Sequence, residues 1–271
     1  MSGDFIFWFV AVFAAITVGL GKGGLPVIAS LAVPSLSLFM SPITAAGLLL
    51  PVYIVSDIFA LIFYRKDFDA KILKISILGM TIGVLIGWAT ANIVIEWLVT
   101  IIIGLMGLIF ALNQILQNKT VNKNPIKINQ TKGIFWCSIA GFTSFISHNG
   151  GPPWQIFVLP LGFKKVVYVG SSVIAFSYVN AIKVVPYYFL GQLNFESIKI
   201  ALFLLIPASF AVYLGYKVVT NIPEKLFFKL VSWALLLISL KLIYDGLILS
   251  NLFNINIKIF KFFFSIFIIN F

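Results

Sequence analysis

The segment GLGKGGLPVIAS, residues 19–30, places four glycines, a lysine and a proline between two long hydrophobic runs. Apolar runs of about 15 to 24 residues recur from one end of the chain to the other, and such runs can cross a hydrocarbon core of roughly 30 Å. Backbone groups in lipid must be paired within the protein, and these runs lack the alternating pattern of membrane strands. The sequence therefore predicts an all-α polytopic membrane protein whose helices this segment interrupts.

The composition supports the same class. Of 271 residues, 61% are hydrophobic and only 10% are charged, whereas a soluble domain of this size carries far more charge. The net charge of +11 does not indicate a nucleic-acid partner, because 13 of the 19 Lys and Arg residues gather beside alternate gaps between apolar runs. That pattern is typical of cytoplasmic loops and predicts a cytoplasmic linker at 118–131. The four groups are Arg65, Lys66, Lys71 and Lys74; Lys119, Lys123, Lys127 and Lys132; Lys164 and Lys165; and Lys217, Lys225 and Lys229.

Three short motifs occur twice in the same order. GGLP at 23–26 returns as GGPP at 150–153, DFD at 67–69 returns as NFE at 194–196, and ANI at 91–93 returns as TNI at 220–222. The offsets are 127, 127 and 129 residues, so the sequence predicts an internal duplication. We expect a first transmembrane repeat at 1–117, the linker at 118–131, a second repeat at 132–250 and a low-complexity apolar tail at 251–271.

The positions of the basic gaps give the two repeats opposite orientations in the membrane. Inverted repeats are found mostly in transporters, with the substrate site near the midplane. About 8–10 membrane helical segments are expected, at approximately 5–20, 24–40, 42–63, 70–89, 96–116, 133–147, 153–163, 166–190, 197–216 and 226–249. Segment 153–163 is too short to span. We therefore expect each repeat to open with a re-entrant hairpin whose tip is the glycine motif, although spanning helices would give the same loop orientation.

The two glycine motifs are the predicted substrate site. Glycines leave backbone N–H groups accessible, proline favours the first position of a helix, and a helix N-terminus attracts anions. Lys22 adds a positive charge, and Gln155 and Asn180 add hydrogen-bond donors. The opposing interpretation is that the glycines only permit tight turns and that Lys22 reaches a cytoplasmic surface. The predicted substrate-binding residues are Gly21, Lys22, Gly23, Gly24, Pro26, His148, Asn149, Gly150, Gly151, Gln155 and Asn180.

Three ionisable residues are candidates for coupling or buried charge. His148 is the single histidine of the chain and titrates near neutrality when unperturbed, so it suits either proton coupling or a fixed hydrogen bond. Asp57 and Lys183 lie inside apolar helices, each eight residues, or about 12 Å, from a helix end. Aligning the repeats places Asp57 opposite Val184, next to Lys183. The two residues are expected to form a buried ion pair, or to relay charge and contact substrate.

The residue pattern argues against an enzyme. The eight acidic residues are scattered, and the sequence contains no paired carboxylates, no metal-ligand cluster and no Ser-His-Asp arrangement. We expect no catalytic residue, metal or cofactor. The expected partners are a small anionic substrate and the lipid bilayer, with no nucleic acid; a homo-oligomer is left open. The alternatives to a transporter are an anion channel and a non-catalytic membrane subunit of a larger complex.

The motifs also resemble those of a known family. GLGKGGLP and the following VPSLSLFMSPITAAGLLLPVYIVSDIFALIFYRKDFD, with GFTSFISHNGGPP and VNAIKVVPYYFLGQLNF, are similar to the TauE/SafE-type sulfite exporters over about residues 5–250. The resemblance implies a permease of the bacterial inner membrane for sulfur-containing anions such as sulfite, thiosulfate or organosulfonates. It also implies coupling to protons.

Overall fold

The computed structural model describes residues 5–40, 42–91, 93–116 and 127–250, and within these ranges the chain is helical with no strand. The first half contains α1 (Phe5–Lys22), α2 (Pro26–Ala29), α3 (Ala32–Leu36), α4 (Pro42–Tyr64), α5 (Ala70–Ala89) and α6 (Glu96–Leu116). The second half contains α7 (Gln130–Ser147), α8 (Gly151–Val158), the 3₁₀ helix η1 (Leu159–Leu161), α9 (Lys165–Phe189), α10 (Phe195–Asn221) and α11 (Glu224–Leu249). The predicted tail at 251–271 and most of the predicted linker lie outside the described residues.

Seven of these helices are long and apolar enough to cross a membrane: α1, α4, α5, α6, α9, α10 and α11. The prediction of an all-α polytopic membrane protein is therefore confirmed. The predicted segment 24–40 is divided into the short helices α2 and α3, and segment 153–163 is formed by α8 and η1. The predicted segment at 133–147 begins earlier, at Gln130, because the Asn129 side chain accepts a hydrogen bond from the Lys132 amide and caps the helix.

The repeated DFD and NFE motifs have a structural role at the starts of α5 and α10. The Asp69 side chain accepts a hydrogen bond from the Ile72 amide at 2.8 Å, and the Asn194 side chain accepts one from the Ser197 amide at 2.9 Å. Each of these residues is the N-cap of the helix that follows, where Asp and Asn are favoured. The two motifs thus start corresponding helices in the two halves.

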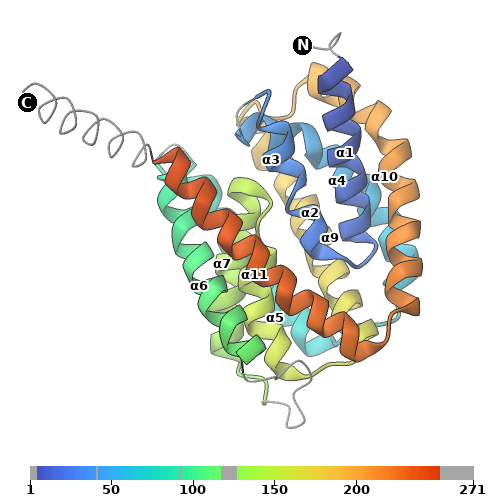
Figure 1. Ribbon diagram of the computed structural model, residues 1–271. Coiled ribbons are helices and arrows are strands. Elements are labelled where there is room, and N and C mark those ends of the chain that lie inside the picture. Colours follow the sequence, from blue (N-terminus) through green and yellow to red (C-terminus); the bar gives the residue numbers. More distant parts are fainter. Residues whose placement is uncertain (1–4, 41, 92, 117–126, 251–271) are drawn as a thin grey trace, which may run out of the picture.

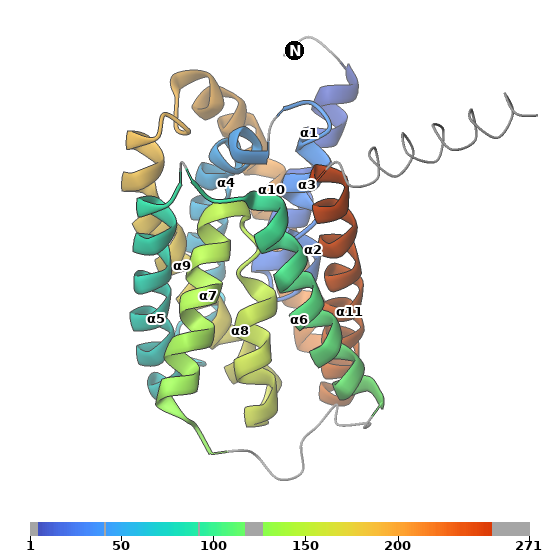
Figure 2. The same ribbon diagram turned by 90° about the vertical axis from the view of Figure 1, so that its left-hand side faces the viewer.

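The basic connections lie at one end of the molecule. The α4–α5 turn, the start of α7, the start of α9 and the α10–α11 turn meet at the lower end in Figures 1 and 2, and α1 begins at the opposite end. The basic residues of these connections and of the adjoining helix ends are Arg65, Lys66, Lys71, Lys74, Lys127, Lys132, Lys164, Lys165, Lys217, Lys225 and Lys229.

Helices of one half pack against helices of the other. α1 packs on α10 and α7 packs on α5, while α4 contacts α9 and α6 contacts α11. Small residues allow the close approaches. A Cβ atom added to Gly23 of the α1–α2 connection would lie 2.4 Å from the Val212 carbonyl oxygen of α10, and one added to Gly83 of α5 would lie 2.0 Å from the Ser138 carbonyl oxygen of α7.

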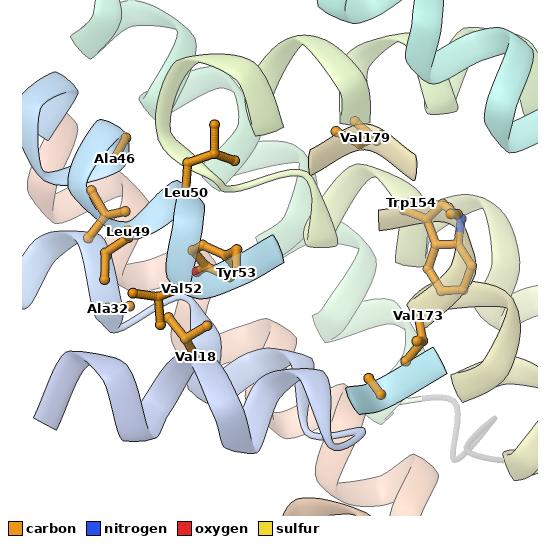
Figure 3. Close-up of a cluster of buried hydrophobic side chains, with 14 of the residues drawn as sticks. Val18, Ala32, Ala46, Leu49, Leu50, Val52, Tyr53, Trp154, Val173 and Val179 are labelled. Carbon is orange, nitrogen blue, oxygen red and sulfur yellow. The ribbon is translucent and has the colours of Figure 1, made fainter. Parts of the chain in front are cut away.

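The main hydrophobic core surrounds α4 and α9 (Figure 3). Buried side chains from α1, α3 and α4 pack with those of α8 and α9, including Val18, Ala32, Leu49, Leu50, Val52, Trp154, Val173 and Val179. A second, smaller cluster joins α6 to α11 through Ile103, Ile238 and Leu242. The α6–α11 pair therefore has a small packing core in addition to the main core, to which the start of α11 contributes Phe227, Phe228 and Val231.

Candidate functional site

The first glycine motif forms the connection between α1 and α2. The amides of Gly23, Gly24 and Leu25 donate hydrogen bonds to carbonyl oxygens of the last turn of α1, at 2.8, 3.1 and 3.2 Å. The prediction that the Gly23 and Gly24 amides are free for an anion is therefore wrong, because these groups satisfy the C-terminal carbonyls of α1. Glycine is needed at position 24, where φ is +116°. α2, which begins at Pro26, has only four residues.

The second glycine motif forms the connection between α7 and α8. His148 has a left-handed backbone conformation, with φ of 55°, and its amide donates to the Ser144 carbonyl oxygen at 3.2 Å. The Asn149 amide donates to the Thr143 carbonyl oxygen at 3.3 Å. Gly150 is the N-cap of α8. Both motifs thus stop one helix and begin a second that packs back against the first, as α7 and α8 do in Figure 2.

The two connections meet at one cavity. It has about 70 Å³ open to the centres of water-sized molecules, which is enough for several waters or one small oxyanion. Seven of the predicted substrate-binding residues line it: Gly21, Lys22, His148, Asn149, Gly151, Gln155 and Asn180. Three other predicted glycines have packing roles. Gly23 contacts α10, Gly24 lies beside the Tyr64 hydroxyl, and Gly150 lies against the Ala140 carbonyl oxygen and the Phe176 ring.

Asp57 is held between two lining residues that come from different halves of the chain. The Lys22 Nζ atom lies 2.6 Å from Asp57 Oδ1, and the Asn180 Nδ2 atom donates to Asp57 Oδ2 at 2.7 Å. The side chains of Lys22 and Asp57 are 9% and 5% exposed. The ion pair expected between Asp57 and Lys183 is replaced by one between Asp57 and Lys22, so Asp57 connects α1 to α9 through α4.

Lys183 belongs to a second hydrogen-bond network. Its Nζ atom contacts the Ser144 carbonyl oxygen at 3.0 Å, the Ser144 hydroxyl at 3.2 Å and His148 Nδ1 at 3.0 Å, and the residue is fully buried. His148 Nε2 lies 3.1 Å from the Ala46 carbonyl oxygen. Since a carbonyl oxygen only accepts, a neutral His148 carries its proton on Nε2 and accepts from Lys183 at Nδ1. This geometry fits a fixed hydrogen-bonding role for His148.

Two residues of the site were not predicted from the sequence. The Tyr53 ring stacks on His148, with centroids 4.5 Å apart, and its centroid lies 5.3 Å from Lys22 Nζ. Ser144 provides two of the three atoms that Lys183 contacts. Tyr53 lies four residues before Asp57, and Ser144 lies four residues before His148. Helical spacing thus contained a signal for both, because residues at i and i+4 share a helix face.

Gln155 provides an unpaired hydrogen-bond acceptor at the cavity. Its side chain is 1% exposed and lines the cavity, and its Oε1 atom has no hydrogen-bond partner within the described part of the chain. An unpaired buried acceptor costs about 1–3 kcal/mol, so a water or a ligand group that donates to Oε1 would be favoured, whereas the oxygens of an anion can pair only with the NH₂ group of Gln155. No group of three His, Cys, Asp or Glu side chains that could hold a metal is found among the described residues. The cavity therefore offers lysine and amide groups suited to a small anion.

A second cavity adjoins the first through Asn149, which lines both. It has about 250 Å³ open to water-sized molecules and is bounded by residues of α3 and of the α6–α11 pair, among them Ser37, Thr100, Leu242 and Asp245. Asp245 pairs with Lys241 one turn earlier in α11. Since the end of α11 lies opposite the basic connections (Figure 1), this cavity is located toward the non-basic end of the molecule.

Comparison with known proteins identifies one family. The family model described as "Sulfite exporter TauE/SafE" matches residues 5–242 of the chain. No curated protein sequence and no solved structure gives a match. The match covers both glycine motifs and every side chain that lines the first cavity.

Proposed function

We propose that this chain, which belongs to the sulfite exporter TauE/SafE family, is a secondary transporter that moves a small sulfur-containing anion across the bacterial inner membrane. The family is one of membrane transporters of sulfur anions, and the seven apolar helices make the chain a multi-pass membrane protein. Sulfite, thiosulfate and organosulfonates are the proposed substrates.

The observation that carries the proposal is the cavity between the two glycine motifs. It combines the buried Lys22 with the amide side chains of Asn149, Gln155 and Asn180 inside a helical membrane protein. A buried ionisable group such as Lys22 is costly in such a protein and usually serves a substrate or ion pathway. A sulfur oxyanion has several acceptor oxygens, which these donors can contact together.

We further propose that the two halves are inverted repeats. In the order of the repeats, α1 corresponds to α7, α4 to α9, α5 to α10 and α6 to α11. The packing supports the proposal, because exchanging each helix for its counterpart converts the α1–α10 contact into the α7–α5 contact. The same exchange leaves the α4–α9 and α6–α11 contacts unchanged, because each of these contacts joins two counterparts. A two-fold axis passing between α4 and α9 produces this pattern, and the cavity lies beside these two helices. The glycine motifs then act as the tips of two hairpins that enter from opposite sides of the membrane.

The basic end of the molecule is proposed to face the cytoplasm, following the bias of Lys and Arg toward cytoplasmic loops. The linker at 118–131 then lies in the cytoplasm. In this orientation the second cavity, which shares Asn149 with the first, is proposed to lie on the outer side of the substrate site. Transport is proposed to be coupled to protons, because three ionisable groups lie at or beside the cavity: Asp57 and Lys183 are buried and His148 is half-buried.

Transport into liposomes tests the function directly. The purified protein is reconstituted, and uptake of radiolabelled sulfite, thiosulfate and sulfoacetate is measured with and without an imposed proton gradient. We expect one of these anions to accumulate only with the gradient. Uptake that never exceeds equilibration indicates an anion channel, and no uptake by a folded protein contradicts the proposed substrate class.

Two lysine variants test the site. Lys22→Ala removes the cation of the cavity and is expected to abolish transport, whereas Lys66→Ala removes an exposed lysine of the α4–α5 turn and should leave transport unchanged. Thermal unfolding of both proteins checks their folding. An anion present at 100 times its dissociation constant should stabilise the wild type by about 2.7 kcal/mol. Equal transport by wild type and Lys22→Ala would exclude Lys22 from the site.

A further inference from the structure

The lysine that lines the cavity is already paired with an acidic side chain. Lys22 lines the cavity, and its Nζ atom lies 2.6 Å from Asp57 Oδ1. Asp57 itself does not line the cavity but contacts two residues that do, Lys22 and Asn180. An incoming anion that reaches Lys22 therefore approaches a carboxylate of the same charge, in a site where water screens little of the repulsion.

Asp57 and an anionic substrate compete for the positive charge of Lys22. Lys22 and an ionised Asp57 together carry no net charge, so adding a monovalent substrate leaves an uncompensated negative charge in a buried site. Taking up one proton on Asp57 removes that charge and frees Lys22 for the substrate. Protonation and substrate binding are then linked, and each favours the other.

We propose that Asp57 is an internal counter-anion that occupies Lys22 in the empty protein and accepts the coupling proton when the substrate takes its place. The inference rests on the proposed function as an anion transporter and assigns its coupling step to one carboxyl group. Asp57 is a positioning residue in this scheme, since it acts on the substrate through Lys22.

Asn180 fits both forms of Asp57. Its amide N–H donates to the ionised carboxylate at 2.7 Å. A protonated carboxyl group needs an acceptor for its O–H, and the amide oxygen of the same asparagine supplies one after rotation of the side chain. A lysine or arginine in place of Asn180 would serve only the ionised form.

Other titratable groups surround Asp57 on each packed element. α1 provides Lys22, α4 itself provides Tyr53 one turn earlier, α9 provides Lys183, and His148 lies between α7 and α8. α10 contacts α4 nearer the basic end, where the Tyr216 ring stacks on Phe63. Among these groups Asp57 is the one whose protonation removes a negative charge from Lys22, which singles it out as the carrier.

Binding measurements on the full-length protein test the inference. Methanesulfonate, an organosulfonate, is the probe because it is monovalent and stays ionised throughout the neutral range. Its affinity is measured at about pH 5.5 and about pH 8 for wild type and Asp57→Asn. We expect the wild type to bind about tenfold more tightly at the lower pH. Asp57→Asn should bind at least about tenfold more tightly than wild type at the higher pH, with little dependence on pH. Sulfite and sulfoacetate are tested in parallel.

A second measurement needs no variant. Calorimetry of the wild type in buffers of different ionisation enthalpy should show uptake of about one proton per bound anion. Binding without proton uptake overturns the inference even if Asp57→Asn does not fold. Wild-type binding with no gain in affinity in a folded Asp57→Asn also overturns it and leaves the proposed function intact. No binding of any tested anion by either protein overturns both.

Discussion

The imidazole of His148 lies flat against the Tyr53 ring, with ring centroids 4.5 Å apart and planes inclined by only 11°. The same imidazole contacts the Ala46 carbonyl oxygen with one nitrogen and Lys183 with the other. Tyr53 belongs to α4 of the first half, and His148 belongs to the α7–α8 connection of the second. The stack therefore fixes the tip of one hairpin to the central helix of the opposite half.

Two substitutions of Tyr53 separate the ring from its hydroxyl group. Tyr53→Phe keeps the stack and loses the hydrogen bond to the Ala29 carbonyl oxygen, so its unfolding free energy should fall by only about 0.5–1.5 kcal/mol. Tyr53→Leu loses the stack and should reduce anion transport strongly, because His148 and Lys183 lose their support. Thermal unfolding and liposome uptake check both variants. Equal transport by Phe and Leu variants would show that the stack has no role.

The backbone at His148 predicts a second pair of variants. A φ of 55° is tolerated by asparagine and strongly disfavoured by β-branched residues. Both variants lose the contacts of the imidazole and should be less stable than wild type, and His148→Val should be less stable than His148→Asn by a further ~1–2 kcal/mol. Thermal unfolding in detergent measures the difference. If the two variants unfolded at the same temperature, the left-handed conformation would not be a constraint on this position.

Gly23 and Gly151 should respond differently to alanine. A Cβ atom at Gly23 would lie 2.4 Å from a backbone oxygen of α10, so Gly23→Ala should cost about 1–3 kcal/mol of stability. A Cβ atom at Gly151 meets only the Gln155 amide nitrogen, at 3.7 Å, and would extend into the cavity. Gly151→Ala should therefore fold normally and bind its anion more weakly. Unfolding temperature and binding affinity, measured on both proteins, distinguish a packing glycine from a cavity glycine.

Lys165 is a buried lysine with a purely structural role. Its Nζ atom donates to the carbonyl oxygens of Val219 and Ile222, at 2.6 Å each, and so caps the C-terminal end of α10. Lys165→Met should lower the unfolding free energy by about 1–3 kcal/mol without changing the anion affinity of the folded protein. Lys164→Met, at the exposed neighbouring position, is the matched control and should change neither. A loss of affinity in Lys165→Met would connect α10 to the site.

The helices and the two helix-interrupting motifs could be predicted from the sequence, because hydrophobic length, glycine and proline act locally. Seven of the eleven predicted substrate-binding residues line one cavity, because each motif follows the end of a helix and the two connections come together there. Whether the backbone amides of Gly23 and Gly24 are free or hydrogen-bonded could not be predicted. It depends on how the chain leaves the last turn of α1, which the residue types alone do not determine.

The partner of Asp57 could not be found by aligning the repeats, for a geometric reason. α4 and α9 run in opposite directions, so equivalent positions face each other only near the point where the helices cross. At an offset of 127 residues, Asp57 is equivalent to Val184, yet it contacts Asn180, which is equivalent to Tyr53. Aligning the repeats shows which positions are equivalent, whereas contact between residues of α4 and α9 depends on how far each residue lies from the point where the helices cross.

The ion pair between Lys22 and Asp57 also bears on whether the carrier can return without cargo. A lone buried lysine would hold the empty protein on one side of the membrane, because moving an unpaired charge through the apolar interior is unfavourable. With Asp57 as its partner, the vacant site is neutral and can turn back, so we expect one-way net flux into a compartment that contains no substrate. Asp57→Asn should lose this return step and become an obligate exchanger, which releases labelled methanesulfonate only when unlabelled methanesulfonate is present outside, because Lys22 and one monovalent anion together are neutral. Equal release by this variant with and without outside methanesulfonate would contradict that behaviour.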